Sequence, residues 1–172
     1  YVTAPDGTNP RGKVYLIRPS GEKLIVDDGL RFPNGVALSA DQTQLYVTES
    51  ATHWVWIYTI KSDGTLAYKQ RFGWLHTPDS EDNAWPDGLK SDTAGRIFVA
   101  TRLGIQVMDQ LGRVEAIIPI PASKGQASNV CFGGVNFDYL YVSAVDKVFR
   151  RKLKTRGVNS FDKPIKPANP RL

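Results

Sequence analysis

The stretch FPNGVALSADQTQLYVTES, residues 32–50, places two short apolar runs on either side of a polar turn. Both runs contain β-branched and aromatic residues, which favour strands, so the stretch predicts a β-hairpin. Asn34 and Gly35 stand where the first strand should begin. Neither residue gives a core an apolar side chain, so their presence needs a reason other than packing.

Two further segments of the chain repeat this hairpin. NVCFGGVNFDYLYV (129–142) matches NGVALSADQTQLYV (34–47) without a gap. DGLKSDTAGRIFV (87–99) matches it with one residue fewer in the turn. Each unit therefore starts with a side chain that carries an oxygen: Asn34, Asp87 or Asn129. Repetition at a period of about 40 to 50 residues is typical of radial or solenoid architectures.

Each hairpin is followed by a third strand: WVWIYTI, GIQVMD or KVFRRK. Two units then pass through a glycine turn, at Gly64 and Gly112, into a fourth strand. No segment keeps a helical repeat for three turns, so the predicted fold class is all-β. Four antiparallel strands per repeat predict the blades of a β-propeller, about three and a half of them.

The predicted partial propeller covers residues 1–156, and a basic tail rich in proline follows it at 157–172. Two complete blades lie between two incomplete ones. The expected blade ranges are 1–28 (incomplete), 33–73, 86–121 and 128–154 (incomplete).

In a propeller the first strand of every blade lines the central channel. Asn34 and Asp87, with Asn129 from the next blade, should therefore approach a common point on the axis. Hard cations such as Ca²⁺ take several oxygen ligands, and amide and carboxylate oxygens suit them. PNG and PDG are also ordinary turn tripeptides. Their recurrence at one position of the repeat favours the metal site.

Composition limits the alternatives. The formal charge of +5 and pI near 9.4 permit an acidic partner, but the basic residues are dispersed except in RRKLKTR (150–156), which is expected to be a solvated strand and tail. Nucleic-acid binding is not expected. The single cysteine excludes an internal disulfide, and Cys131 is expected to be a small buried hydrophobe. No apolar run reaches membrane-spanning length, and no signal peptide is recognised at residue 1.

The longest loop, GWLHTPDSEDNAWPDG (73–88), leads directly to Asp87 and should overhang the channel mouth. Such loops often shape substrate pockets. Trp74 and Trp85 are candidate apolar walls, and Trp85, His76, Arg102 and Asn129 are the predicted substrate contacts. A merely solvated loop is the alternative. Only two histidines occur, too few for a histidine-based metal site.

The chain resembles the gluconolactonase, regucalcin (senescence marker protein) and luciferin-regenerating-enzyme group of six-bladed propellers. The resemblance rests on FPNGVALSADQTQLYV, PDGLKSDTAGRIFVAT and NVCFGG followed by LYVSA, and it extends from YVTAPDG to KVFRRK. It implies a metal-dependent lactonase that carries one divalent cation, Ca²⁺ or else Zn²⁺ or Mg²⁺. Asn34 would match the family's metal-binding Asn. Asp87 would match its metal-binding Asp, which is also regarded as the catalytic base.

The family's remaining metal ligand, a Glu, and a further Asn have no counterpart in these residues. The expected function is therefore hydrolysis of a sugar-acid or similar lactone, incomplete in the isolated chain. The alternative is a non-catalytic propeller segment that acts as a binding or assembly module. The expected partners are a small-molecule lactone and a second copy of the chain that closes the open ring, with no nucleic acid and no membrane. The compartment remains open.

Overall fold

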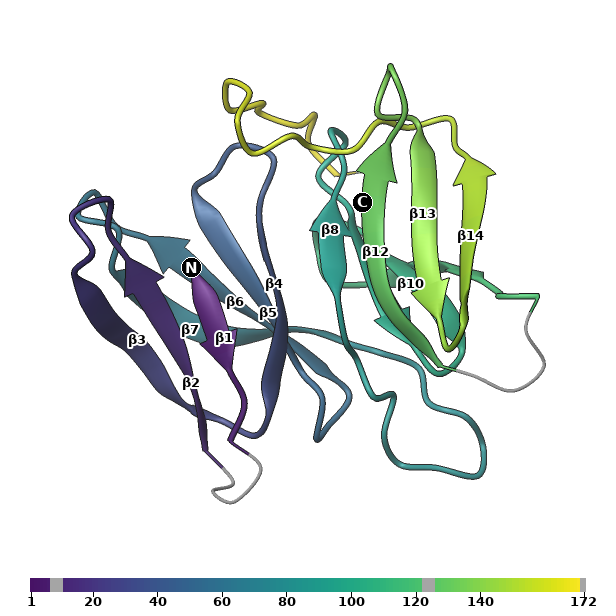
Figure 1. Cartoon of the computed structure of the whole chain (residues 1–172), viewed down its shortest axis with the longest axis horizontal. Coiled ribbons are helices and arrows are strands. Elements are labelled where there is room, and N and C mark those ends of the chain that lie inside the picture. Colours follow the sequence, from purple (N-terminus) through teal and green to yellow (C-terminus); the bar gives the residue numbers. More distant parts are fainter. Residues whose placement is uncertain (7–10, 122–125, 171–172) are drawn as a thin grey trace.

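The computed structural model describes residues 1–6, 11–121 and 126–170 of the chain. Within these residues it contains fourteen strands, grouped in four antiparallel sheets, and no helix (Figure 1). The all-β prediction is confirmed, and so are the antiparallel sheets. The glycines of the two predicted turns, Gly64 and Gly112, adopt positive φ angles of 81° and 79°. No helix of the described part is long and apolar enough to span a membrane.

The four sheets follow one another along the sequence. The first is β1 (Val2–Ala4), β2 (Gly12–Ile17) and β3 (Lys23–Leu30). The second is β4 (Pro33–Leu38), β5 (Gln44–Glu49), β6 (Trp54–Ile60) and β7 (Leu66–Trp74). The third is β8 (Leu89–Ser91), β9 (Ile97–Thr101), β10 (Gly104–Met108) and β11 (Val114–Ile118). The fourth is β12 (Ala127–Gly133), β13 (Tyr139–Ala144) and β14 (Lys147–Lys152).

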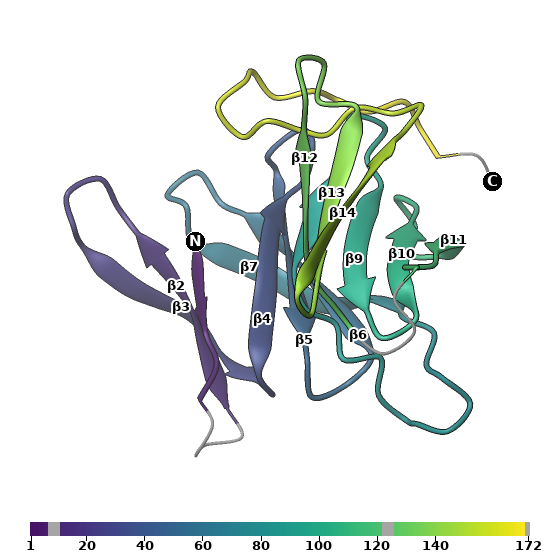
Figure 2. The same cartoon turned by 45° about the vertical axis from the view of Figure 1, so that its right-hand side comes forward.

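Successive sheets pack face to face around an open arc (Figures 1 and 2). The first strands of the last three sheets, β4, β8 and β12, are neighbours on the inner side of the arc, and β1 lies against β4. Each sheet then runs outward through hydrogen-bonded neighbours in sequence order. This is the blade arrangement that the repeats predict.

An apolar cluster fills the space between each pair of adjacent sheets. Strand β9 shows how one strand serves two clusters. Ile97 and Val99 pack toward the second sheet, whereas Phe98 and Ala100 pack toward the fourth, and all four are buried. Side chains alternate across a strand, so a strand covered on both faces is apolar at every position. Burial of each large aliphatic side chain contributes about 1.5–3 kcal/mol.

The C-terminal segment crosses the turns at one end of the arc (Figure 2). Backbone hydrogen bonds join Thr93 N to Arg156 O at 2.9 Å, Val158 N to Ser91 O at 3.0 Å and Ile165 N to Ala40 O at 2.8 Å. The tail is therefore tied to both the second and the third sheets.

Cys131 differs from its predicted place, since its side chain is exposed. Strand alternation gives the reason. Val130 and Phe132 face the cluster between the third and fourth sheets, so Cys131 faces the inner side of the arc.

A partly buried polar group links the first sheet to the second. The Asp27 carboxylate on β3 accepts hydrogen bonds from Tyr58 Oη and from Gly29 N, and its Oδ2 lies 2.7 Å from Lys69 Nζ. Burial by itself would raise the pKa of Asp27, but the hydrogen bonds from Lys69, Tyr58 and Gly29 outweigh it, so the pKa is lowered. A carboxylate with a lowered pKa stabilises the fold wherever it is ionised.

Replacing Asp27 with Asn is expected to lower the free energy of unfolding by about 1–3 kcal/mol at neutral pH, because Lys69 and Tyr58 lose a charged partner. The difference from the unmodified chain should be full above the ordinary Asp pKa of 3.8 and should shrink as the pH falls through the lower folded value. Urea unfolding at several pH values measures it. Asp28→Asn, at the exposed neighbouring position, is the matched control. Equal losses for both variants at every pH would contradict the assignment.

Candidate functional site

The inner ends of the second, third and fourth sheets meet at backbone distance. A Cβ added to Gly35 would lie 2.3 Å from the carbonyl oxygen of Asp87. A Cβ added to Gly88 would lie 2.0 Å from Oδ1 of Asn129. Both glycines are thus required by close approach, and each stands directly after a predicted site residue. The structure therefore brings Asn34, Asp87 and Asn129 to one place.

The side chain of Asn34 lies close enough to the Asp87 carboxylate to act on its pKa, and its Nδ2 also donates to Ser50 Oγ at 3.1 Å. Asp87 is half-buried, and no Lys or Arg of the described residues forms a salt bridge with it. Burial raises the pKa of Asp87 above its ordinary value, although the hydrogen bonds from Asn34 and from Gly88 N act in the opposite direction. A half-buried carboxylate without a cationic partner favours a proton or a cation.

Asn129 takes part in a different way. Its Oδ1 accepts a hydrogen bond from Val130 N at 2.8 Å, and its side chain rests on Gly88. The residue is exposed on the inner side of the arc. Asn129 thus lies next to Gly88, which directly follows Asp87.

The approach to both site residues has the same unusual backbone. Phe32 precedes Pro33 with a φ of 59°, and Trp85 precedes Pro86 with a φ of 48°. A bulky residue in the left-handed region costs about 1–3 kcal/mol, and a following proline favours extended backbone instead. Such conformations persist where the surroundings impose them, often at functional sites. Here they aim the chain into the start of two inner strands.

The loop before Asp87 is held by polar contacts. Arg102 forms an ion pair with Glu81, and its guanidinium lies over the ring of Trp85 at 5.1 Å. Gln126 Nε2 donates to Trp85 O at 2.9 Å. Arg102, Glu81, Gln126 and Pro78 line an open hollow of about 350 Å³. The structure thus groups two of the predicted substrate contacts, Arg102 and Trp85, at the end of the loop.

The other predicted loop residues lie apart from this group. The backbone of His76 is clamped by Gln106, which accepts from His76 N and donates to His76 O, both at 2.8 Å, and the His76 residue is exposed. Trp74 stacks on His53 with ring centroids 3.7 Å apart, at the end of β7. Trp74 and Trp85 thus contact different partners, and a shared apolar wall stays a prediction.

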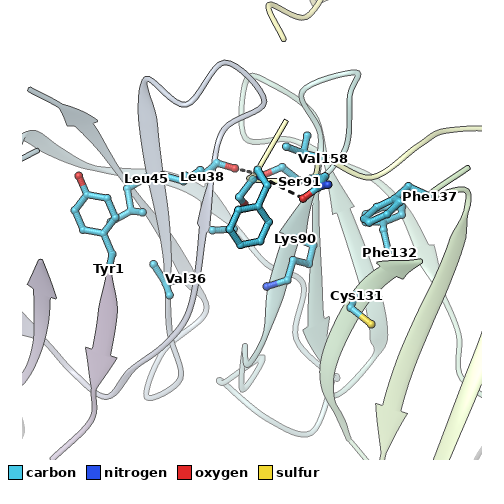
Figure 3. Close-up of a pocket in the computed structure, with 14 residues that line it drawn as sticks. Tyr1, Val36, Leu38, Leu45, Lys90, Ser91, Cys131, Phe132, Phe137 and Val158 are labelled. Carbon is cyan, nitrogen blue, oxygen red and sulfur yellow. Dashed lines mark hydrogen bonds between the residues drawn. The ribbon is translucent and has the colours of Figure 1, made fainter. Parts of the chain in front are cut away.

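A groove of about 360 Å³ runs along the inner side of the arc (Figure 3). Val36 and Leu38 of β4, Lys90 beside them on β8 and Cys131 on β12 form its walls, and the tail borders it at residues 158–161. Its lining is mostly apolar and includes the positively charged side chain of Lys90. Sequence reasoning missed Lys90 because a lysine within a short strand carries no motif.

Two hydroxyl residues were also missed: Thr48 on β5, and Ser50 just after it. Ser50 accepts from Asn34 Nδ2 at 3.1 Å, and Thr48 donates to Asp87 O at 2.8 Å. The sequence marks Ser50 only by comparison of the repeats, in which Arg102 and Val145 stand at the matching positions.

The described residues contain no group of three or more His, Cys, Asp or Glu side chains that could hold a metal ion. The fit of a cation therefore depends on amide and carboxylate oxygens. Asn34 and Asp87 supply one of each, side by side, at a place that lacks a competing cation. These two oxygens can fill part of the coordination shell of a hard divalent ion. Ca²⁺, for example, binds six to eight oxygen ligands.

Comparison with known proteins shows what this chain is similar to. Residues 2–146 match the sequence model of the family described as "SMP-30/Gluconolactonase/LRE-like region". A gluconolactonase of Zymomonas mobilis is 34% identical over 152 residues, which are 84% of this chain and 41% of that protein.

Among solved structures, a gluconolactonase of Xanthomonas campestris has a TM-score of 0.71 and 27% identity over 86% of this chain and 46% of its own. A calcium-binding regucalcin of Agrobacterium tumefaciens has a TM-score of 0.72 and 17% identity, over 90% of this chain and 56% of its own, which shows the fold alone. The chain thus spans about half the length of the proteins it matches.

Replacing Gly88 with Ala tests the close approach. The new methyl group would overlap the Asn129 side chain, so we expect a loss of about 1–3 kcal/mol in the free energy of unfolding. Gly29→Ala is the control, because a Cβ there meets only the flexible end of Lys69 at 3.2 Å and Asp27 Oδ1 at 3.5 Å. Chemical denaturation of both variants measures the difference. Equal stability would show that the inner strands are less tightly packed than described.

Proposed function

The chain belongs to the SMP-30/gluconolactonase/LRE-like family, and from that premise we propose that it carries part of a metal-dependent lactonase site. The observation that supports the proposal is the contact between Asn34 and Asp87. These two side chains come from adjacent sheets, lie at the inner end of the blades and share no salt-bridge partner within the described residues. A sugar-acid lactone is the proposed substrate, since the Zymomonas and Xanthomonas relatives are called gluconolactonases.

Asn34 and Asp87 would hold the cation. When bound, a divalent ion would polarise the lactone carbonyl and lower the pKa of a water molecule. Asp87 would remain an anion beside the ion and accept a proton from the attacking water. That water would add to the carbonyl carbon, the ring C–O bond would break, and the proton taken up by Asp87 would pass to the leaving ring oxygen, which gives a hydroxy acid. Asn34 is neutral at every working pH, so its role is to ligate and position.

The oxygen donors favour Ca²⁺ over Zn²⁺, which prefers nitrogen and sulfur ligands. Both histidines lie away from Asn34 and Asp87: His53 stacks on Trp74, and His76 stands at the start of the loop. Mg²⁺ also accepts oxygen ligands but demands stricter octahedral geometry. Arg102, Trp85 and the exposed Asn129 surround the approach and are the proposed substrate contacts, with His76 farther back on the loop.

Divalent-cation binding should depend on Asp87 more than on Asn34, because loss of a charged ligand removes more attraction for the ion. We expect Asp87→Ala to lower Ca²⁺ affinity by more than about 100-fold and Asn34→Ala to lower it less. Calorimetric titration measures both, in the chain alone and in a fusion that adds the N-terminal portion of the Zymomonas relative. The same fusion is assayed for lactone hydrolysis with and without Ca²⁺.

Asp79→Asn is the matched control, since Asp79 is an exposed acidic residue on the same loop. It should leave Ca²⁺ affinity and turnover unchanged. Undiminished affinity in both Asp87→Ala and Asn34→Ala would overturn the site assignment. Cation binding without lactone turnover in the fusion would instead favour the non-catalytic alternative, a propeller segment that serves as a binding module.

The open arc leads to a second expectation. On the first sheet Val2, Tyr15 and Ile25 are in register across β1, β2 and β3, and Val2 and Ile25 are 45% and 54% exposed. The opposite face packs on the second sheet through Val14. A blade normally has both faces covered by neighbours. We propose that a second copy of the chain covers this face.

The isolated chain should therefore sediment as a dimer or larger species at micromolar concentration. Ile25→Lys is expected to shift it toward monomer, because it places a charge on the apolar row. Tyr68→Lys is the control, since Tyr68 is 80% exposed on β7 and outside that row. A chain that stays monomeric at about 100 µM would contradict self-association.

A further inference from the structure

We infer that Ser50 is a positioning residue of the proposed cation site, because it fixes the Asn34 amide and the backbone before Asp87 against one another. The inference rests on the proposed function and adds a residue to it. Ser50 lies just after β5 and is 3% exposed. It belongs to the same sheet as Asn34, whereas Asp87 leads into the next sheet.

Every polar group of Ser50 has a partner at the site. Its backbone N donates to Phe32 O at 3.0 Å, and its backbone O accepts from Asn83 Nδ2 at 2.9 Å. Its Oγ accepts from Asn34 Nδ2 at 3.1 Å and donates to Pro86 O. One buried residue thus connects the chain on both sides of the Asn34–Asp87 contact.

The direction of these bonds decides which atom of the amide is free. The Pro86 carbonyl can only accept, so the single hydroxyl proton of Ser50 goes to it. Ser50 Oγ can then only accept from Asn34, which requires Nδ2 to face the serine. Asn34 Oδ1 is therefore held on the other side of the amide. Only that oxygen of the amide can ligate a cation, so Ser50 fixes the side on which Asn34 offers a ligand.

The hydroxyl is specific to this repeat. In the matched hairpins Ser50 corresponds to Arg102 and to Val145. The blade fold itself therefore does not require a hydroxyl at this position. It occurs in the one repeat that lies between Asn34 and Asp87.

Thr48, on β5 itself, complements Ser50. Its Oγ1 accepts from Gly35 N at 2.7 Å and donates to Asp87 O at 2.8 Å. Thr48 thus joins the two backbones, whereas Ser50 also reaches the Asn34 side chain. Removing the serine hydroxyl should therefore affect amide orientation while leaving the Thr48 link in place.

The test compares Ser50→Ala with Ser39→Ala. Ser39 is a buried serine at the opposite end of the same hairpin, where its hydroxyl donates to Asp41 and accepts from Gln44 N. We expect Ser50→Ala to lower Ca²⁺ affinity by about 10- to 100-fold, the usual effect of removing a residue that orients a ligand. Ser39→Ala should leave the affinity unchanged even if it lowers the unfolding temperature. Ser50→Thr keeps the hydroxyl and should recover most of the affinity.

Amide hydrogen exchange supplies a readout that needs no metal. Asp87 N donates to Ala100 O and Gly88 N to Ser128 O, at 2.9 and 3.0 Å. Faster exchange of these two amides in Ser50→Ala, and not in Ser39→Ala, is the expected result. Unchanged exchange at both amides would overturn the inference whether or not Ca²⁺ binds. If the unmodified chain and its fusion bind no Ca²⁺, the proposed function fails, and exchange alone decides the role of Ser50.

Discussion

The close approach of β4, β8 and β12 is the constraint on which the rest of this structure depends. A side chain at Gly35 or Gly88 would overlap the backbone or the side chain of the next sheet. With no Cβ at these positions, the starts of three inner strands lie in contact. The sheets then diverge outward, and apolar clusters fill the widening space between them. A modest overlap at the inner ends would separate the sheets and open these clusters to water, at a cost that grows with the apolar area exposed.

The polar groups at the inner ends follow from the same geometry. Backbone that lies this close cannot be hydrated, so its donors and acceptors need partners within the protein. The hydroxyls of Thr48 and Ser50 provide them across the gap between sheets. Asp87 is different, because its carboxylate is half-buried and receives hydrogen bonds from Asn34 and Gly88 but no salt bridge within the described residues. The fold thus stabilises its own backbone at this place while leaving one charge uncompensated, which is the condition a cation site requires.

The strained residues Phe32 and Trp85 belong to the same picture. Each carries a positive φ directly before the proline that leads to a site residue. The carbonyl groups of both residues are hydrogen-bonded: Phe32 O accepts from Ser50 N, and Trp85 O accepts from Gln126. The energy stored in two such residues, about 1–3 kcal/mol each, is offset by packing elsewhere in the arc. Strain at equivalent positions of two blades indicates a shared requirement for how the chain enters the inner strands.

The sequence by itself determined the repeat, and with it the all-β fold, the strand order within the sheets and the positions of Asn34 and Asp87 at the inner ends. Hydrophobic alternation and glycine turns are local, so they can be read from neighbouring residues. Tertiary structure alone decided what these residues touch. Ser50 and Thr48 carry no motif, because their hydroxyls donate to the backbone carbonyls of Pro86 and Asp87, more than thirty residues away. Lys90 likewise gains its place from residues of other sheets that line the same groove. Cys131 shows the converse case: its apolar neighbours predicted burial, but the inner side of the arc is open, and solvent reaches it.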